Sequence, residues 1–142
     1  MDISSLPYEL DLPVLAEDID QLGHVNNVVY LRWVQEAAIA HWTAAASPEA
    51  QAAFFWVVAR HEIDYKRPAF LKDRIIARTW VGPCAPRSFE RNTELLRASD
   101  RALLAKVRTL WCPMDMRTGR PTDVTPEVLA GFSTSTAAAE AC

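Results

Sequence analysis

The segment from Val28 to Ala46 restricts the possible folds more than any other part of the sequence. When it is drawn as a helix, apolar residues cover most of its circumference, and such a helix must be wrapped by other elements. Asn26 or Asn27 can cap its start, and Ser47-Pro48 breaks it after about Ala46. Only a strip near Arg32, Gln35, Glu36 and Thr43 stays polar. The segment also contains His41, and together with Arg32, Gln35 and Glu36 this residue excludes a simple membrane span.

Five further segments have strand-like patterns and could supply the wrapping. They cover Tyr8–Leu15, Phe54–Lys66, Asp73–Val81, Arg87–Arg97 and Ala102–Met114. Pro13 suggests an edge strand or a strand end, and breaks at Gly82-Pro83 and Ser99-Asp100 favour antiparallel hairpins. A helix of about 20 residues and a strand of about 9–11 residues both span about 30 Å. We therefore expect an α+β fold in which one long central helix is enclosed by a five-stranded antiparallel sheet.

The second half of the Phe54–Lys66 segment predicts which of its side chains face the helix. An apolar set alternates with a charged set, so the apolar set should share the inner face. The apolar set is Val57, Ala59, His61, Ile63 and Tyr65, and the charged set is Arg60, Glu62, Asp64 and Lys66.

Length and composition fit one small globular domain. The chain has 142 residues, of which 50% are hydrophobic, and a chain of this size buries enough surface to fold without a disulfide or metal. A turn at Thr118-Gly119-Arg120-Pro121 and a short helix from Pro126 to Phe132 should complete the fold. We expect the domain to span residues 1–132 and residues 133–142 to form a flexible tail.

Charge and cysteine content exclude several classes of function. The formal net charge is −3 and no basic block is longer than Lys66-Arg67, which argues against a nucleic-acid partner. Cys84, Cys112 and Cys142 form no C-x-x-C pair, so neither a disulfide framework nor a cysteine zinc site is favoured. The start of the chain lacks the pattern of a signal peptide. We expect a cytoplasmic protein with no membrane partner.

The segment from Asp18 to Tyr30 carries the most promising chemistry, because Asp20, Gly23 and His24 stand directly before the long helix. The first N–H groups of a helix have no internal partner and lie at its positive end. They can stabilise an oxygen that becomes negative during a reaction. A nearby carboxylate can attack a carbonyl carbon or take a proton from water. Asp20 and these N–H groups thus form a minimal acyl-transfer site.

Each of these residues also has a structural interpretation. Asp and Asn before a helix commonly act as caps, and Gly23 fits a turn. A single histidine such as His24 more often makes a structural hydrogen bond. Asn26 and Asn27 can close the turn through side-chain bonds to the backbone. Residue types and spacing alone leave both interpretations open.

Other polar residues are weaker candidates. His61 lies on the apolar side of its segment, which favours a hydrogen-bonded core histidine. His24, His41 and His61 lack metal-ligand spacing, which argues against a zinc site. Ser88 and Ser99 lack the G-x-S-x-G context of a nucleophile.

A gapless D-x-D-x-x-G-H-V-N-N-x-x-Y signature spans Asp18 to Tyr30 and continues into Leu31-Arg32-Trp33. Together with Ile63–Asp73 and Asp115–Pro121, it resembles the 4-hydroxybenzoyl-CoA thioesterase-like family of hotdog-fold acyl-CoA thioesterases. The resemblance covers nearly the whole chain to about Phe132. It implies a single hotdog domain.

The resemblance assigns catalytic roles. The second Asp of the D-x-D pair acts as nucleophile or general base in that family, which implies this role for Asp20. The backbone N–H near Asn27 falls where the family polarises the thioester carbonyl. His24 replaces an apolar residue of the aromatic-acyl members but matches a histidine of plant-type acyl-carrier-protein thioesterases. Asp20, His24 and Asn27 are therefore the catalytic candidates, and Asp18 is expected to be a cap or an orienting acid.

The resemblance also suggests residues that bind substrate. Lys66 and Arg67, with Arg87 and Arg91 as further options, could contact the phosphates of a coenzyme A-like carrier, although solvated strand-end charges are the simpler interpretation. Glu36 could be a helix-borne acid, but an i,i+4 ion pair with Arg32 explains it more simply. The substrate-binding candidates are Gly23, Val25, Asn26, Tyr30, Lys66 and Arg67, and no residue is expected to bind a metal.

The expected function is hydrolysis of acyl-CoA to a free acid and coenzyme A. No cofactor is expected, because coenzyme A is part of the substrate. The His24-Val25-Asn26-Asn27 run leaves an acyl-carrier-protein thioesterase open, and a non-catalytic acyl-CoA-binding hotdog domain is a third option. Because hotdog sites form between subunits, the resemblance implies a homodimer or homotetramer. The five tryptophans should pack the core and the subunit contact, with one or two lining an acyl tunnel, and they are Trp33, Trp42, Trp56, Trp80 and Trp111.

Overall fold

The long helix expected from the sequence is present as α1 (Asn27–Ala45) in the computed structural model, which describes residues 6–85, 87–126 and 128. The side chain of Asn26 caps α1 by accepting a hydrogen bond from the N–H of Val28 at 3.1 Å. Beyond α1, the hydroxyl of Ser47 accepts from the N–H of Ala50 at 3.1 Å, and Pro48 opens α2 (Pro48–Ala53). The predicted break is therefore also the start of a second helix.

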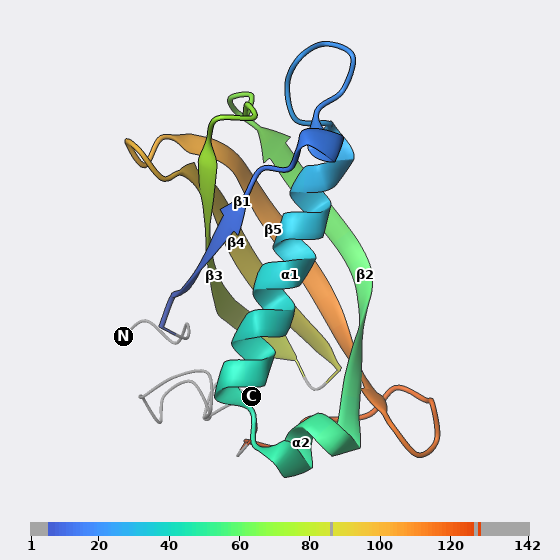
Figure 1. Ribbon diagram of the computed structural model, residues 1–142. Coiled ribbons are helices and arrows are strands. Elements are labelled where there is room, and N and C mark those ends of the chain that lie inside the picture. The colour runs from blue at the N-terminus through green and yellow to red at the C-terminus, as the bar shows by residue number, and fades with distance from the viewer. Residues whose placement is uncertain (1–5, 86, 127, 129–142) are drawn as a thin grey trace.

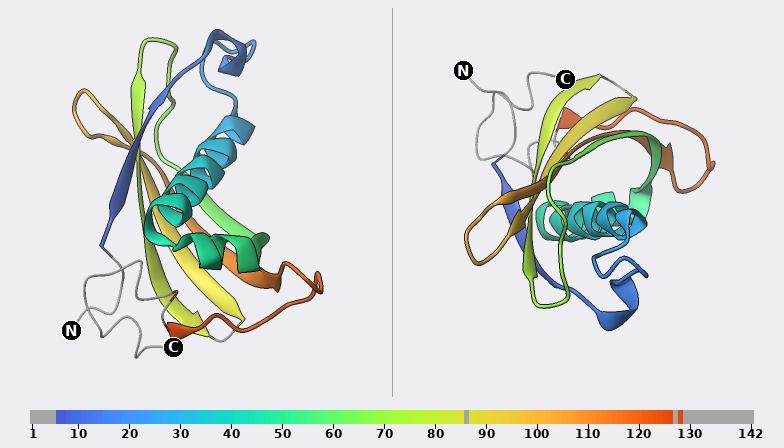
Figure 2. Two further views of the ribbon diagram at one scale, coloured as in Figure 1. Left: turned by 60° about the horizontal axis from the view of Figure 1, so that its bottom comes forward. Right: turned by 90° about the horizontal axis from the view of Figure 1, so that it is seen from above.

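Five strands form one sheet around α1 (Figures 1 and 2). The order is β1-β3-β4-β5-β2 with every neighbouring pair antiparallel, so β1 and β2 are the two edges. Seen along α1, the sheet curves around one side of the helix (Figure 2). The expected α+β fold is thus confirmed. The strands are β1 (Tyr8–Pro13), β2 (Phe54–Tyr65), β3 (Arg74–Ala85), β4 (Ser88–Arg97) and β5 (Leu103–Asp115).

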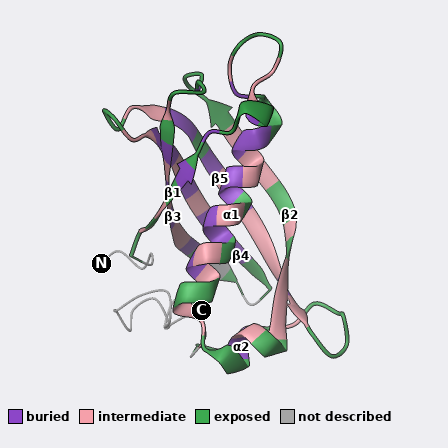
Figure 3. Cartoon of the chain, viewed as in Figure 1, coloured by how far each residue is buried: buried purple, intermediate pink, exposed green. Residues whose placement is uncertain are grey.

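The hydrophobic core fills the space between α1 and the sheet. Trp33, Val34 and Ala37 are fully buried and belong to one cluster with residues of β3, β4 and β5. Their spacing puts them on one side of the helix. Elsewhere on α1, Val28 is 68% exposed and Ile39 is 62% exposed. Figure 3 shows that buried and exposed stretches alternate along this helix. One sheet therefore covers only part of the apolar surface of α1.

The predicted inner face of β2 is wrong in its first half. The register runs from Val58 opposite Trp111 to Arg60 opposite Leu110, so the strand contains a bulge at Ala59. A bulge adds one residue to a strand and shifts the alternation that follows it. His61 shares its face with Val58 instead of Val57, which is 39% exposed. A count of every second residue across Ala59 therefore assigns Val57 and Ala59 to the wrong side.

The predicted break at Gly82-Pro83 is also wrong, because β3 continues through it to Ala85. The register shifts between Val81 and Cys84, and such an irregularity tolerates a proline that has no N–H to donate. The turn after β4 forms as expected, with the N–H of Arg97 donating to the carbonyl of Ala102 at 2.9 Å.

The C-terminal part is described only in its first section. The turn lies over residues 116–118, slightly before the predicted 118–121, and the N–H of Gly119 donates to the carbonyl of Asp115 at 2.8 Å. Gly119 adopts a φ of 69° that favours glycine. Most of the predicted helix from Pro126 to Phe132, and the tail from residue 133, lie outside the described residues. Among the described helices, none has the length and hydropathy to cross a membrane.

Candidate active site

A short hairpin over residues 18–26 carries the candidate catalytic residues to the start of α1. The N–H of Asn26 donates to the carbonyl of Asp18 at 2.9 Å, and the N–H of Asp20 donates to the carbonyl of His24 at 2.9 Å. Gly23 lies at the tip with a φ of 86°, and its N–H donates to the carbonyl of Asp20 at 3.0 Å. This conformation suits glycine because a side chain is strained there. Gly23 thus shapes the loop.

The hairpin brings the carboxylate of Asp20 and the imidazole of His24 together. Oδ1 of Asp20 accepts a hydrogen bond from the N–H of Leu22 at 2.8 Å. Oδ2 lies 3.8 Å from Nδ1 of His24, and the two side chains are 22% and 33% exposed. One carboxylate oxygen is held by the backbone, and the other lies beside a polar, solvent-accessible ring.

The first residue of α1 leaves a donor available beside this pair. Within the described part of the chain, the backbone N–H of Asn27 forms no hydrogen bond. Its carbonyl is fixed by the hydroxyl of Tyr65, which donates at 3.1 Å. The end of β2 thereby holds the first turn of α1 in place. A free N–H at the positive end of a helix suits a developing oxyanion.

Two of the predicted substrate-binding residues are buried and join the hairpin to its neighbouring loop. The N–H of Val25 donates to the carbonyl of Ala69 at 2.8 Å. The hydroxyl of Tyr30 accepts from the N–H of Ala69 at 2.9 Å and lies 3.4 Å from the carbonyl of Arg67. Burial raises the pKa of the Tyr30 hydroxyl above its ordinary value. Both residues hold the loop after β2 against the site.

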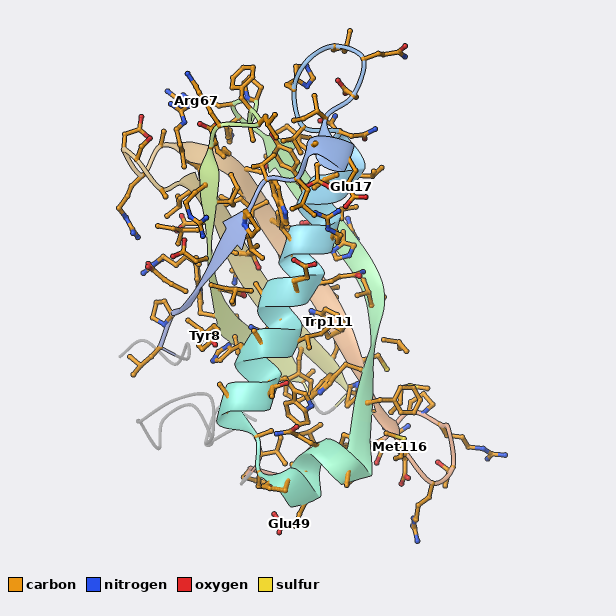
Figure 4. All side chains as sticks on the ribbon, viewed as in Figure 1. Tyr8, Glu17, Glu49, Arg67, Trp111 and Met116 are labelled. Carbon is orange, nitrogen blue, oxygen red and sulfur yellow. The ribbon has the colours of Figure 1, made fainter. Side chains whose placement is uncertain are left out.

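Lys66 and Arg67 lie on that loop and are exposed. Their N–H groups donate to the carbonyl of Leu104 at 2.8 and 3.1 Å, which fixes the loop backbone. Arg67 and Glu17 lie at the end of the molecule where α1 begins, whereas Met116 and Glu49 lie near the opposite end (Figure 4). The two basic side chains therefore occupy the same end of the molecule as Asp20.

Asp18 has a different environment from Asp20. It is 2% exposed, and its two oxygens accept from Nη1 and Nη2 of Arg32 at 2.8 and 3.0 Å. The Arg32 guanidinium holds the pKa of the Asp18 carboxyl below its ordinary value. Glu36 lies 3.7 Å from Arg32 and is part-exposed, so the predicted i,i+4 pair is present. The closer partner of Arg32, however, is Asp18.

A cavity of about 590 Å³ lies between the second half of α1 and β2. Trp56 stands edge-on to both Trp42 and Phe89, with ring centroids 5.5 and 5.3 Å apart. Gln35, Glu90 and Arg91 are the charged or polar residues at its wall from α1 and β4. Its size is typical of small-molecule sites. The aromatic lining consists of Trp42, Phe54, Phe55, Trp56, Phe89 and Trp111.

Arg91 corrects the sequence-based expectation of a solvated strand-end charge. It is 6% exposed, and its Nη1 lies 2.9 Å from Nδ1 of His41 and 3.1 Å from the hydroxyl of Thr79. Burial lowers the pKa of Arg91 to about 10. Burial and the charge of Arg91 lower the pKa of His41 to about 4, so His41 is neutral near pH 7. Arg91 lies on the inner face of β4, beneath the helix, whereas Arg87 is exposed and pairs with Asp123 at 3.0 Å.

The remaining candidates have structural partners. Nδ1 of His61 lies 2.9 Å from the hydroxyl of Thr109, as expected for a core histidine, and burial lowers the pKa of this imidazole. Across the described ranges, no cluster of three or more His, Cys, Asp or Glu side chains is arranged to hold a metal ion.

Comparisons with known proteins agree with this architecture. The family model described as the thioesterase-like superfamily matches residues 14–132. No curated protein sequence matches the chain. Among solved structures, a 1,4-dihydroxy-2-naphthoyl-CoA thioesterase from Synechocystis is similar with a TM-score of 0.76 and 18% identity, over 89% of this chain and 95% of that one.

Two further solved structures are similar over most of their length. A thioesterase from Thermus thermophilus, complexed with coenzyme A and Zn, has a TM-score of 0.73 and 26% identity over 84% of this chain and 92% of its own. A DHNA-CoA thioesterase from Staphylococcus aureus has a TM-score of 0.74 and 14% identity over 83% of this chain and 80% of its own.

Proposed function

The chain belongs to the thioesterase-like superfamily and has the hotdog fold, and from this premise we propose that it hydrolyses acyl-CoA thioesters to a free acid and coenzyme A. The observation that carries the proposal is the carboxylate of Asp20 at the start of α1, where the N–H of Asn27 is free. Two similar structures are named for CoA-thioester substrates and a third is complexed with coenzyme A, which supports coenzyme A as the carrier.

In the proposed reaction, the thioester carbonyl oxygen accepts a hydrogen bond from the N–H of Asn27, which stabilises its developing negative charge. Because the N–H of Leu22 occupies Oδ1 of Asp20, Oδ2 attacks the carbonyl carbon or takes a proton from an attacking water. The carbon–sulfur bond then breaks and coenzyme A leaves as a thiolate. The thiolate takes up the proton that Asp20 removed from water or, in the nucleophilic route, a proton released when the anhydride is hydrolysed. In the nucleophilic route, water next hydrolyses the anhydride formed with Asp20. His24, whose Nδ1 lies 3.8 Å from Oδ2, would tune or position this carboxylate once substrate is bound.

The loop after β2 fits the carrier end of the substrate. Lys66 and Arg67 are exposed beside the hairpin and would contact the phosphates of coenzyme A. Gly23, Val25, Asn26 and Tyr30 would shape the entrance through the backbone contacts described above. The proposed chemistry needs no metal or redox cofactor, because a carboxylate and a helix N–H supply the base and the oxyanion donor. We place the reaction in the cytoplasm, where a free cysteine such as Cys112 stays reduced.

We further propose that the active form contains at least a dimer. Strand β2 is a sheet edge, and Val28 and Ile39 on α1 are largely exposed. Antiparallel pairing of β2 with β2 of a second copy would cover both features and extend the sheet. It would also bring the Asp20 end of one protomer near the aromatic cavity of its partner. The cavity would then receive the acyl group.

The test measures thiol release from short, long and aromatic acyl-CoA esters by the wild type and the Asp20→Ala variant. Asp11, which is exposed on β1, supplies the matched control variant Asp11→Ala. We expect the rate to fall by on the order of a hundredfold or more in Asp20→Ala, with folding and oligomer size unchanged, and to be retained in Asp11→Ala.

Three outcomes would replace the proposal. Faster turnover of acyl-carrier-protein thioesters than of CoA thioesters would favour the carrier-protein enzyme suggested by the His24-Val25-Asn26-Asn27 run. Binding of the esters without thiol release would favour a non-catalytic acyl-CoA-binding domain. Full activity of Asp20→Ala would move the site elsewhere.

A further inference from the structure

The buried ion pair between Asp18 and Arg32 lies two residues from the proposed catalytic carboxylate. We infer that Asp18 and Arg32 are positioning residues, which hold the 18–26 hairpin so that Asp20 faces the start of α1. The inference rests on the proposed function, because it names the residues that set the geometry of that site. It assigns neither residue a contact with substrate.

Three connections meet at Asp18. Its carboxylate binds the guanidinium of Arg32 through two hydrogen bonds, at 2.8 and 3.0 Å. Oδ2 also accepts from the N–H of Leu15 at 2.9 Å, which closes the turn before the hairpin. The main-chain carbonyl accepts from the N–H of Asn26, the residue that caps α1. A displacement of Asp18 would therefore move the base of the hairpin.

The hairpin transmits this position to Asp20 through its backbone. Residues 18 and 26 pair at its base, and residues 20 and 24 pair at the next step. Arg32 lies on α1 itself, so the ion pair fixes the hairpin relative to the helix that carries the N–H of Asn27. The ion pair therefore links both groups proposed to act on the thioester, the Asp20 carboxylate and the N–H of Asn27, to the same helix.

The geometry of the pair argues for precision as well as for stability. The Asp18 side chain is 1% exposed, whereas that of Arg32 is 42% exposed, so only the carboxylate is deeply buried. A two-pronged guanidinium fixes both distance and angle, which a lysine ammonium cannot do. Small misplacement of a catalytic group can cost about a hundredfold in rate. The two-point contact therefore suits precise placement of the hairpin, which an ion pair with a single contact would not provide.

The test compares Arg32→Gln, Arg32→Lys and Asp18→Asn with Glu36→Gln, which removes the other, more distant partner of Arg32. Two readouts are needed: kcat and KM for thiol release, and hydrogen–deuterium exchange of the 16–26 segment. We expect kcat to fall about a hundredfold in Arg32→Gln and about tenfold in Arg32→Lys, with KM within about threefold of the wild type. Exchange should accelerate in the 16–26 segment alone, and Glu36→Gln should match the wild type.

Asp18→Asn keeps the shape of the side chain and protects the test if Arg32→Gln fails to fold. Unchanged exchange of the 16–26 segment in Arg32→Lys and Asp18→Asn would overturn the inference. The inference would also be overturned if kcat in these variants stayed within twofold of the wild type, or if their exchange accelerated evenly over the whole chain. If the wild type releases no thiol, the proposed function fails, while the exchange measurement still decides whether the pair orders the hairpin.

Discussion

The surroundings of the two ends of α1 are stabilised by different kinds of interaction. At the N-terminal end, the 18–26 hairpin is held by backbone hydrogen bonds and by the Asp18–Arg32 ion pair, and the Asp20 carboxylate remains 22% exposed. In the C-terminal half, aromatic rings surround a cavity above the buried side chains of Arg91 and His41. Backbone hydrogen bonds tolerate changes of side chain, whereas a packed aromatic cluster does not. We therefore expect substitutions at the two ends to separate catalysis from stability and selectivity.

The largest effect is expected at the N-terminal end, from Asp20→Asn. The amide keeps an oxygen for the N–H of Leu22 but lacks the carboxylate that, in the proposed reaction, attacks the carbonyl carbon or takes a proton from water. We expect kcat to fall about 10²- to 10⁴-fold, while the free energy of unfolding changes by less than about 0.5 kcal/mol. Thiol release and urea denaturation measure the two quantities. A large loss of stability would show that Asp20 supports the fold and would remove the contrast between the ends.

The second prediction concerns acid sensitivity at the C-terminal half. The pKa of His41 is lowered from 6.5 to about 4, so below pH 6.5 the unfolded chain takes up a proton that the folded chain does not. The stabilisation is fully present above pH 6.5 and is lost as the pH falls to 4, by roughly 3 kcal/mol in total.

Urea denaturation between pH 7 and pH 4 measures this loss, with His41→Gln as the non-titrating control. The variant should be less sensitive to pH, because glutamine can still accept a hydrogen bond from Arg91 but takes up no proton. Equal pH dependence in the two proteins would mean that His41 is not the group responsible. It would also mean that the group responsible for the acid sensitivity lies outside the cavity region.

The third prediction concerns whether Asp20 of one protomer acts on an acyl group that is bound in the cavity of its partner. Ala38 is 6% exposed and lines the cavity, so Ala38→Trp should reduce turnover of a bulky aromatic acyl-CoA about tenfold and leave acetyl-CoA nearly unchanged. Thr43→Trp, on the exposed side of α1, is the matched control. Steady-state rates on the two esters give the selectivity.

Refolding Ala38→Trp together with Asp20→Ala then tests the dimer. In the proposed arrangement, about a quarter of the wild-type rate on the bulky ester returns, because half of the randomly formed dimers are mixed and each holds one complete site. If Asp20 used the cavity of its own protomer, mixing would restore nothing. Such a result would place the whole site within one chain.

The smallest effect is expected from Glu36→Gln. Glu36 is part-exposed and lies 3.7 Å from Arg32, whose closer partner is Asp18. The free energy of unfolding should change by less than about 0.5 kcal/mol, and kcat should stay within twofold. A marked loss of activity would indicate that Glu36 is a catalytic acid in addition to Asp20, the role considered for it from the sequence.

Local sequence patterns predicted α1 and the composition of the candidate site. Val28–Ala46 is apolar on most sides, and Asn26 precedes it as a cap, so both signals lie within the element itself. Asp20 and His24 are four residues apart around Gly23, so a tight loop was enough to bring them together. The resemblance to the hotdog family supplied the roles, which the geometry accommodates and the experiments above test.

Contacts between distant segments were not predictable in the same way. Arg32 and Asp18 are 14 residues apart, and their pairing depends on the short 3-10 helix η1 (Ala16–Asp18) before the hairpin. The cavity lies between side chains from α1, α2 and four strands, so its presence depends on how six elements pack together. Arg91 did leave a signal, because it alternates with Phe89 and Leu95 on β4 and therefore shares their buried face.

The bulge at Ala59 determines how β2 can change in length. Val58 and His61 share one face across it, so deletion of Ala59 would leave a regular strand with every inward side chain still inward. What would change is the bend that a bulge imposes on its strand. Trp56 at the cavity and Tyr65 at the start of α1 would then be held at a different angle. The loss of this single residue would change the angle between the two halves of the strand without exchanging any of the residues that either half presents.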